Sequence, residues 1–231
     1  MKKFYKAARA VADGDGFQIA LDGRMARTPR KAPLRLPARA LAEAIADEWQ
    51  AQGDSVDPLT MPLTRLVNSC IDTVTTQREA VIQTISAYGG NDLVCYRADT
   101  PPELVAAQHA HWQPLVTWAE RRHDAVLTVT SGITHVEQPA AALASLRAAV
   151  AAFDDYRLAA LHDLTTITGS LVIGLAVADG EIEVDRAWVA AQVDEAHQAA
   201  RWGEDKEAAA RRDRLKAEFD QAKRFLDLLR D

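Results

Sequence analysis

The residues best placed for chemistry are a glutamate and two tryptophans near the C-terminus. Glu195 follows Trp188 by seven residues and precedes Trp202 by seven. On a helix, a seven-residue step turns the side chain by only about 20°, so these three side chains are predicted to lie along one stripe. Tryptophan is enriched at protein interfaces and isolated acids are depleted from their centres, so Glu195 would need a cationic or amide partner. This stripe is a candidate protein-binding surface.

A second set of polar side chains falls on another face of the same predicted helix. Its members are Asp194, His197, Gln198 and Arg201. Gly203 directly after the stripe marks the expected end of the helix, because glycine commonly terminates helices. The alternative interpretation of the stripe is structural: both tryptophans belong to the core, and Glu195 reaches water from the edge. Both interpretations fit the spacing.

Candidates for acid–base catalysis are fewer. His162-Asp163 and the acids near Glu195 have suitable side chains, but such catalysis needs a pocket and a second group with a separated pKa. Neither a nucleophile elbow nor a Cys-His signature occurs, so Ser170 and Cys95 are predicted to be structural. We expect no catalytic residues. The alternative is a small-molecule enzyme of unrecognised type that uses acidic residues of the helical part.

Three short motifs resemble ligand sites and fail on a specific requirement. The segment 169–174 has the glycine spacing of a phosphate loop, but Leu175-Ala176 follow where Lys and Ser or Thr are required, so its small residues are expected to let two helices pack closely. The segment 13–16 lacks the glutamate of a calcium loop and is predicted to be a hairpin turn. His109 and His111 are two residues apart, whereas zinc ligands on a helix need three or four. No metal and no cofactor are predicted.

Charge and cysteine content narrow the class of partner. The 231 residues carry a net charge of −6, which argues against a duplex nucleic-acid binder, since such proteins need a basic surface. Partners are expected to be proteins or small molecules. Cys70 and Cys95 are predicted to be buried thiols in a reducing compartment. No signal peptide is recognised, and the apolar run 171–178 is too short to span a bilayer, so the expected location is cytoplasmic.

The pattern of elements predicts an α+β protein with two domains. Phe17, Ile19 and Leu21 alternate with polar or small residues, and Asp22-Gly23 supplies a hairpin turn. A helix is predicted over 38–52, and the prolines within 54–64 indicate a stiff linker. We therefore predict a β-rich N-terminal domain with one helix over residues 1–60 and a helical C-terminal domain over residues 61–231.

Helical periodicity dominates the second predicted domain. A capping-box pair, Thr100 and Glu103, and two prolines mark one helix start, and a short strand or extended crossing is expected over 126–130. The other predicted helices cover 66–88, 140–153, 154–178, 185–202 and 207–229.

Along nearly its whole length, the chain resembles a known family, the ATP synthase F1 assembly chaperones that bind the α subunit. These chaperones are found in mitochondria and in some bacteria. The matches begin near Phe4 and reach the last helix. The N-terminal matches are Leu21-Asp22-Gly23-Arg24, Thr28-Pro29, Ile45-Ala46, Glu48-Trp49, Gln52, Met61-Pro62-Leu63-Thr64 and Ile71-Asp72. The others are Asp92-Leu93, Cys95-Tyr96-Arg97-Ala98, Gln108, Trp112, Pro114, Trp118, Thr168-Gly169-Ser170-Leu171, Asp194-Glu195, Gln198 and Trp202-Gly203-Glu204-Asp205. His197 departs from the pattern, since an aromatic residue is expected there.

The resemblance implies a β-rich domain followed by a helical domain and an activity that is not catalytic. Such a chaperone holds the newly made F1 α subunit and covers its β-facing surface until the hexamer forms, which limits wrong association. The implied partner surface consists of Glu195, Asp194, Gln198 and Trp202. The protein is expected to be a monomer when free, without membrane insertion, in the bacterial cytoplasm or, for eukaryotic relatives, in the mitochondrial matrix.

Two further matched segments are expected to be architectural, namely Trp49 and the segment 95–97. Within the latter, Arg97 either staples the two domains through a carboxylate or faces the partner.

Overall fold

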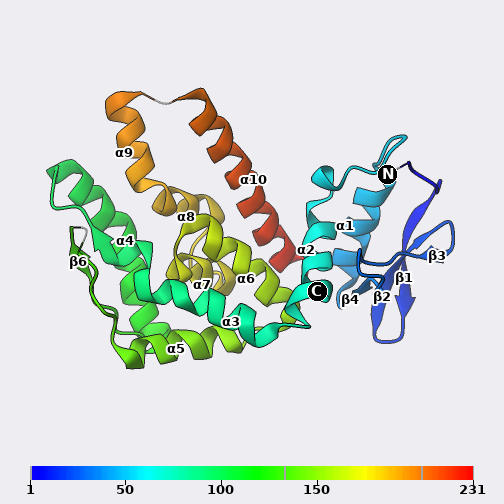
Figure 1. Ribbon diagram of the computed structural model, residues 1–231, viewed down its shortest axis with the longest axis horizontal. Helices are drawn as coiled ribbons and strands as arrows, with labels where there is room; N and C mark the ends of the chain where they lie inside the picture. Colours follow the sequence, from blue (N-terminus) through cyan, green and yellow to red (C-terminus); the bar gives the residue numbers. More distant parts are fainter. Residues whose placement is uncertain (1, 133, 204, 231) are drawn as a thin grey trace. The chain divides into compact units, whose positions relative to one another are not determined.

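The computed structural model describes residues 2–132, 134–203 and 205–230. The chain forms two compact units (Figure 1). The first comprises residues 1–78, 155–160 and 221–231, and the second comprises residues 79–154 and 161–220. Helices α6 (Asp155–Thr168) and α10 (Lys206–Asp227) contribute residues to both. A small antiparallel sheet at the N-terminus is followed by a larger helical part, so the predicted α+β class is confirmed.

The first unit is built on a sheet whose middle strand is β2 (Gly16–Leu21). This strand pairs antiparallel with β1 (Ala8–Asp13), β3 (Arg24–Met25) and β4 (Arg35–Leu36). The turn between β2 and β3 is the predicted Asp22-Gly23, and both residues have the positive φ that a tight hairpin turn requires. The Asp22 carboxylate accepts hydrogen bonds from the amides of Lys6 and Ala7, each at 2.9 Å, which ties the N-terminal segment to this turn.

Helix α1 (Arg39–Gln50) covers one face of the sheet. Its bounds agree with the helix predicted over 38–52. Alternation along β2 points Ile19 and Leu21 to this face, where both are buried together with Leu41 and Ile45 of the helix. Buried aliphatic side chains of this kind each contribute roughly 1.5–3 kcal/mol. The opposite face of the sheet carries the exposed side chains of Arg9 and Met25 beside the small, buried Ala20.

The proline-containing segment and α2 (Pro62–Ser69) are fastened to the first 50 residues. The Glu48 carboxylate accepts hydrogen bonds from the amides of Leu63 and Thr64, each at 2.8 Å, and from the Thr64 hydroxyl at 2.7 Å. It therefore caps the start of α2. Further on, the Thr28 hydroxyl donates to Asp72 Oδ1 at 2.6 Å. These bonds explain why the first compact unit continues to residue 78.

The predicted domain border between residues 60 and 61 stays a prediction. A fragment tests whether the helical part folds without the β-rich part. Residues 65–231 contain the whole second unit, so we expect this fragment, expressed alone, to be soluble and to give a helical circular dichroism spectrum. Its first turns should be the least protected from hydrogen exchange, because the Thr28 partner of Asp72 is removed. Aggregation or a random-coil spectrum would mean that the β-rich part completes the helical core.

The single helix predicted over 66–88 is wrong, because the helix is interrupted. Helix α2 ends at Ser69, a π-helical turn follows at Cys70–Val74, and α3 spans Arg78–Ala87. The amide of Thr75 donates to the carbonyl of Cys70, five residues back, at 2.9 Å. The hydroxyls of Thr75 and Thr76 also bond to backbone carbonyls here, so threonines compete with the regular helical ladder.

The helix predicted over 154–178 is also two helices, α6 and α7 (Leu171–Asp179). Gly169 adopts a φ of +69°, which ends α6, and Ser170 then caps α7 by accepting a hydrogen bond from the Ile173 amide at 3.0 Å. The apolar segment of α7 is buried along its length, so the prediction of a buried helix segment is confirmed. Within the described residues, no helix is long and apolar enough to cross a bilayer.

The second unit places three helices against α4 (Pro102–His123), namely α7, α8 (Val184–Ala191) and α9 (Val193–Trp202). Helix α4 begins where predicted, but the capping box is wrong: Pro101 precedes the helix and no side chain caps it. Helix α5 spans Ala140–Ala151, and α10 matches the last predicted helix closely. The crossing expected over 126–130 ends in β6 (Thr130–Ser131), which pairs with β5 (Tyr96–Arg97) in parallel.

Candidate functional site

The predicted stripe of three residues is divided by a break in the helix. Gln192, with φ −110° and ψ 14°, separates α8 from α9, so the single helix predicted over 185–202 is wrong. Trp188 lies in α8, is only 9% exposed, and packs with its ring 5.8 Å from the ring of Phe219. It therefore belongs to the core. Glu195 and Trp202 both lie in α9, seven residues apart, and remain on one stripe.

The α9 pair is exposed to solvent. The Trp202 side chain is 73% exposed, and the Arg201 guanidinium lies 5.6 Å from its ring centre. Glu195 and Gln198 are exposed as well. Among the residues that the structure describes, neither of these two side chains forms a hydrogen bond or an ion pair. Since the fold makes little use of these three side chains, they are available to a partner.

Asp194 has a different environment, because it is bonded to α4. Gln108 Nε2 donates to Asp194 Oδ1 at 2.6 Å, and Gln108 Oε1 accepts from the Ala98 amide at 2.7 Å. The Gln108 side chain is buried, so both bonds are shielded from water. A second tie from α4 is the indole of Trp112, whose Nε1 donates to the carbonyl of Ala190 at 2.7 Å. These bonds set the position of α8 and α9 against α4.

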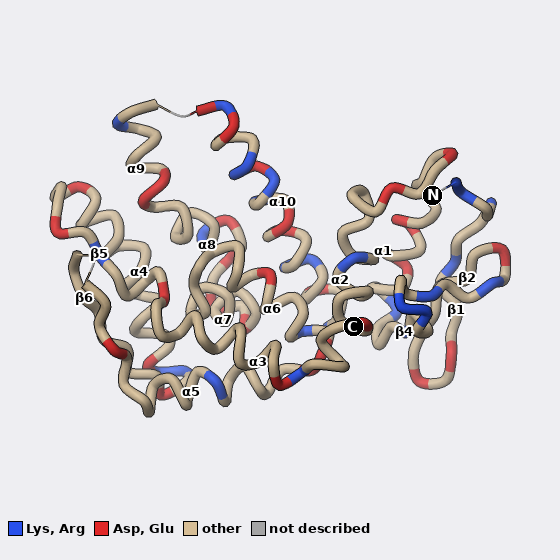
Figure 2. Tube along the Cα trace, viewed as in Figure 1, with Lys and Arg blue, Asp and Glu red and all other residues tan. Residues whose placement is uncertain are grey.

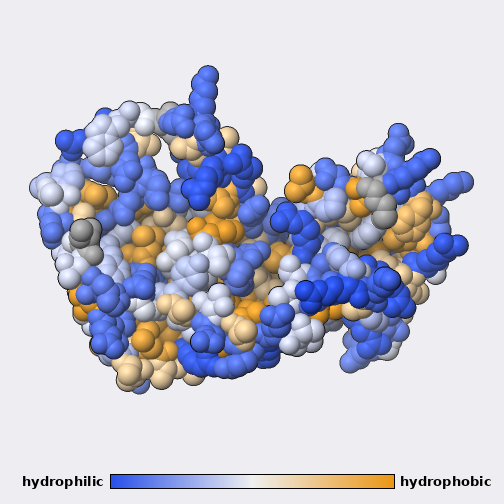
Figure 3. Space-filling view, in the orientation of Figure 1, coloured by the Kyte–Doolittle hydropathy of each residue, from blue (hydrophilic) through white to orange (hydrophobic). Residues whose placement is uncertain are grey.

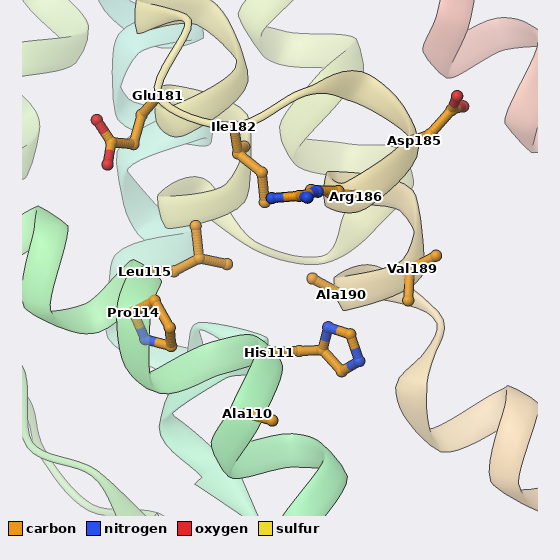
Figure 4. Close-up of a pocket in the computed structure, with 10 residues that line it drawn as sticks. All are labelled: Ala110, His111, Pro114, Leu115, Glu181, Ile182, Asp185, Arg186, Val189 and Ala190. Carbon is orange, nitrogen blue, oxygen red and sulfur yellow. The ribbon is translucent and has the colours of Figure 1, made fainter.

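A groove of about 490 Å³ opens between α4 and α8. Its α4 wall contains Ala110, His111, Pro114 and Leu115, and its other wall contains Ile182, Arg186, Val189 and Ala190. In Figure 4, the Arg186 side chain reaches toward Ile182, whereas Glu181 and Asp185 point away from the groove. His111 lies about one helical turn from Gln108 on α4. The groove therefore begins next to the contact that holds Asp194.

Apolar side chains also appear on the surface of the second unit. Figure 3 shows orange patches of apolar residues among its mostly hydrophilic side chains. Among the residues that line the groove, Val189 is a large apolar side chain that is 49% exposed. Exposed apolar surface next to a groove is typical of a protein-binding site.

Comparison with known proteins identifies the family. Residues 2–120 match the family described as ATP12 chaperone protein. The chain belongs to the ATP12 chaperone family. The crystal structure of Atp12 from Paracoccus denitrificans is 45% identical, with a TM-score of 0.95, over 99% of this chain and 98% of that chain. A mutant of the same Atp12p matches at 44% identity, with the same TM-score and coverage. The Atu1473 protein of Agrobacterium tumefaciens is 40% identical, with a TM-score of 0.91, over 99% of this chain and 85% of that chain.

Membership of the ATP12 family makes the protein a chaperone of ATP synthase assembly, as the resemblance implied. Helix α9 lies beyond the residues matched to the family, but the three similar structures cover almost the whole chain. The chaperone fold therefore includes both the β-rich part and the helices that carry the candidate site.

Many of the motif residues that pointed to the ATP12 family hold the fold together. Thr28 bonds to Asp72, and Glu48 bonds to Thr64, as described above. The ring of Trp49 lies 5.8 Å from the ring of Tyr5, a contact that fits the predicted architectural role. Sequence reasoning missed these pairings, although isolated polar residues inside apolar runs were a signal for them. Glu204, which belongs to the last motif, lies outside the described residues.

The segment with phosphate-loop glycines is filled from within the protein. The Asp92 carboxylate lies at the N-terminus of α7, where it accepts hydrogen bonds from the Ser170 hydroxyl at 2.5 Å and the Val172 amide at 3.0 Å. A helix N-terminus favours an anion, and here that anion is a side chain of the protein. Close helix packing is confirmed at Gly174, where an added Cβ would lie 2.7 Å from the Thr165 hydroxyl of α6.

Asp92 is fully buried, and burial raises its pKa from 3.8 to about 6, although hydrogen bonds from Ser170, Val172 and Val94 lower it. Between these two pH values the folded state binds more protons than the unfolded state. The resulting stability is fully present below about pH 4 and is lost as the pH rises through about 6.

We therefore expect Asp92 to reduce the free energy of unfolding by about 3 kcal/mol between pH 4 and pH 7, at 1.36 kcal/mol for each pKa unit. Urea unfolding of the wild type and of Asp92→Asn, measured side by side at several pH values, isolates this contribution, because the asparagine does not titrate. The difference in unfolding free energy between the two proteins should change steeply between pH 4 and pH 6. A constant difference would contradict the assignment.

The candidates for catalysis and metal binding are not brought together. His162 Nδ1 lies 3.1 Å from Asp163 Oδ1, with both side chains partly exposed. Neither of these residues nor Glu195 lines the groove between α4 and α8. His111 lines that groove, whereas His109 does not. In the part of the chain that the structure describes, no group of three or more His, Cys, Asp or Glu residues is arranged to hold a metal ion.

Arg97 and the two cysteines have structural environments. Arg97 is half-buried in β5, and burial lowers the pKa of its guanidinium. No carboxylate among the described residues forms an ion pair with it, so the staple through a carboxylate is not observed. Cys70 and Cys95 are buried, as predicted. Burial raises the pKa of the Cys95 thiol to about 12, which keeps this thiol protonated and unreactive.

Proposed function

We propose that this ATP12-family chaperone binds the unassembled α subunit of F1 ATP synthase and covers its β-facing surface until the F1 hexamer forms. The observation that carries the proposal is the exposed pair Glu195 and Trp202 on α9. An indole that is 73% exposed adds little to the stability of the fold. Its large apolar surface becomes useful when a partner covers it.

Each of the four predicted partner-binding residues has a specific part in this proposal. Trp202 supplies apolar area and Glu195 supplies a carboxylate for a cationic or amide group of the α subunit. Gln198, exposed one turn beyond Asp194, adds an amide that can donate and accept. Asp194 keeps α9 at a fixed distance from α4 through Gln108 and adds negative charge next to Glu195.

The groove between α4 and α8 extends this surface. Its apolar residues, among them Leu115 and Val189, suit an apolar side chain of the α subunit that would otherwise be exposed before assembly. The acidic side chain of Glu181, which points away from the groove, favours a client with a basic residue beside that apolar segment, whereas Asp185 is already paired with Lys216 at 2.9 Å. Shielding of this kind requires no chemical step, so the protein acts as a binding protein and not as an enzyme.

A capture experiment tests the proposal. The tagged chaperone is incubated with purified F1 α subunit after nucleotide has been removed by apyrase, with purified β subunit as the matched control. We expect the α subunit to be retained without ATP and the β subunit to be washed away. Retention of neither subunit, equal retention of both, or retention of α only when ATP is present would overturn the proposal.

A further inference from the structure

The N-terminal part of the chain is strongly basic, although the whole protein is acidic. Residues 2–39 contain ten Lys and Arg against three Asp, a net charge of +7, whereas the full chain carries −6 and residues 40–231 therefore carry −13. Figure 2 shows the Lys and Arg positions in blue along the N-terminal segment and the strands of the first unit. None of these residues belongs to the proposed surface for the α subunit. Such a separation of charge indicates a second, anionic partner.

The segment before β1 presents an aromatic side chain between two lysines. Lys2 forms an isolated antiparallel bridge with Ser55, and the backbone amide of Lys3 bonds to the carbonyl of Asp54 at 2.9 Å. Along a segment paired in this way, successive side chains point to opposite sides. Tyr5 is buried and Lys3 is partly buried, whereas Lys2, Phe4 and Lys6 are exposed, with Phe4 at 57%.

A second set of basic and apolar side chains lies on the sheet face opposite α1. Arg9 pairs with Ala20, and Ala20 pairs with Met25, so Arg9 and Met25 lie on either side of one small residue on the same face. Met25 is 49% exposed, whereas its neighbour Arg24 pairs with Leu21 and therefore projects from the side of the sheet that α1 covers. We call Lys2, Phe4, Lys6, Arg9 and Met25 the basic face.

The cations of the basic face are not used by the fold. Within residues 2–132, 134–203 and 205–230, the side chains of Lys2, Lys6 and Arg9 form no hydrogen bond or ion pair. Other cations of the same region are engaged: Arg30, for example, donates to the carbonyl of Asp72 at 2.9 Å. Lys6 interacts electrostatically with Asp22, whose carboxylate is bonded to the backbone amides of Lys6 and Ala7. The basic face therefore keeps a net positive charge.

We propose that the basic face docks the protein on the surface of an anionic lipid bilayer. Lysine and arginine side chains near such a surface each contribute roughly 1 kcal/mol through attraction to anionic headgroups. Their apolar stems, with Phe4 and Met25 between them, suit the boundary between headgroups and acyl chains. Figure 3 shows the same mixture on the first unit, where strongly hydrophilic side chains surround apolar ones.

The distribution of the charges favours a bilayer over other anionic partners. The three cations are spread along the segment before β1 and onto β1 itself, so they fit a continuous charged surface better than one bound anion. A duplex would repel the −13 of the remaining chain along its length, and the basic face offers one aromatic side chain for stacking. A bilayer contacts a single face of a docked protein, and the basic face supplies both the cations and the apolar side chains for that contact.

Vesicle sedimentation tests the proposal with the full-length protein and no client. Vesicles contain either phosphatidylcholine alone or phosphatidylcholine with about 30% phosphatidylglycerol. We expect binding only to the anionic vesicles at low salt and its loss at about 0.5 M NaCl, because salt screens the attraction. The triple variant Lys2→Glu, Lys6→Glu, Arg9→Glu should lower the partition coefficient about 100-fold. Phe4→Ser should lower it several-fold at constant charge.

The matched control reverses three cations on α10, Lys206→Glu, Arg211→Glu and Arg214→Glu, all of them exposed. This variant has the same net charge as the first and should bind vesicles like the wild type; both should melt at the wild-type temperature. No binding of the wild type to anionic vesicles, or equal losses in both triple variants, would overturn the proposal. A third outcome would also overturn it: the wild type binds no vesicles, and the first triple variant loses binding to the α subunit or to duplex DNA. The basic face would then recognise an acidic protein or a nucleic acid.

Discussion

Replacing Glu195 by lysine should weaken capture of the F1 α subunit by about 2 kcal/mol, a loss of about 30-fold in affinity. Glu195 is exposed on α9 and forms no hydrogen bond or ion pair with the described residues. The substitution should therefore change the free energy of unfolding by no more than about 0.5 kcal/mol. A binding titration beside a thermal melt measures both quantities on the same preparation.

Glu120→Lys is the matched control for this change. Glu120 is an exposed glutamate on α4 of the same unit and does not line the groove. It should keep wild-type affinity, whereas a general effect of charge would weaken both variants equally. A loss of about 3 to 5 kcal/mol in the stability of Glu195→Lys would instead show that this carboxylate is paired inside the protein.

Trp112→Ala should cause the largest loss of stability, about 5 kcal/mol. Trp112 is completely buried in α4, and truncation of such a side chain costs roughly 3–5 kcal/mol through the cavity that it leaves. Its indole also donates to the carbonyl of Ala190 in α8, which would be left without this donor. Since the whole fold is stable by only about 5–15 kcal/mol, chemical denaturation should show a protein close to unfolding.

Trp112→Phe separates the two contributions. It fills most of the cavity but cannot donate to Ala190, so we expect a smaller loss of about 2 kcal/mol. Because this bond positions α8 beside the groove, the α-subunit affinity of this variant should also fall modestly. Stability losses that are equal in the two variants would contradict the role given to the indole hydrogen bond.

Local sequence patterns predicted the parts of the fold that local physics determines. The alternation of Phe17, Ile19 and Leu21, with Asp22-Gly23 after it, was sufficient for the strand and its turn. The helix over 38–52 followed from its apolar face in the same way. These elements depend on neighbours within a few residues, which periodicity and turn chemistry capture.

Helix breaks were harder to predict, because tertiary contacts select them. Gln192 is not a helix breaker, yet α8 and α9 separate there. On one side, α8 is fixed through Ala190 and Trp112; on the other, α9 is fixed through Asp194 and Gln108. A prediction from periodicity alone therefore placed Trp188 on one stripe with Glu195 and Trp202, whereas only the latter two share a helix.

The candidate site was predicted in part. Exposure of Glu195 follows from neither its type nor its spacing, because the structural interpretation fitted equally well. The structure separates the two tryptophans: Trp188 is buried against Phe219, whereas Trp202 is exposed. The groove combines α4 with α8, about 75 residues apart in the chain, so no local pattern indicated it. The periodic pattern of apolar residues carries no information on contacts between segments that are far apart in the sequence.

The most direct test of the proposed binding surface compares these two tryptophans. The dissociation constant for purified F1 α subunit and the free energy of unfolding are measured for Trp202→Ala and Trp188→Ala. For Trp202→Ala we predict an affinity at least about 30-fold weaker at unchanged stability, because the side chain is 73% exposed. For Trp188→Ala we predict a stability loss of roughly 3 kcal/mol, because its ring packs on Phe219. Wild-type affinity in Trp202→Ala would contradict the assignment of α9 as the surface that holds the α subunit.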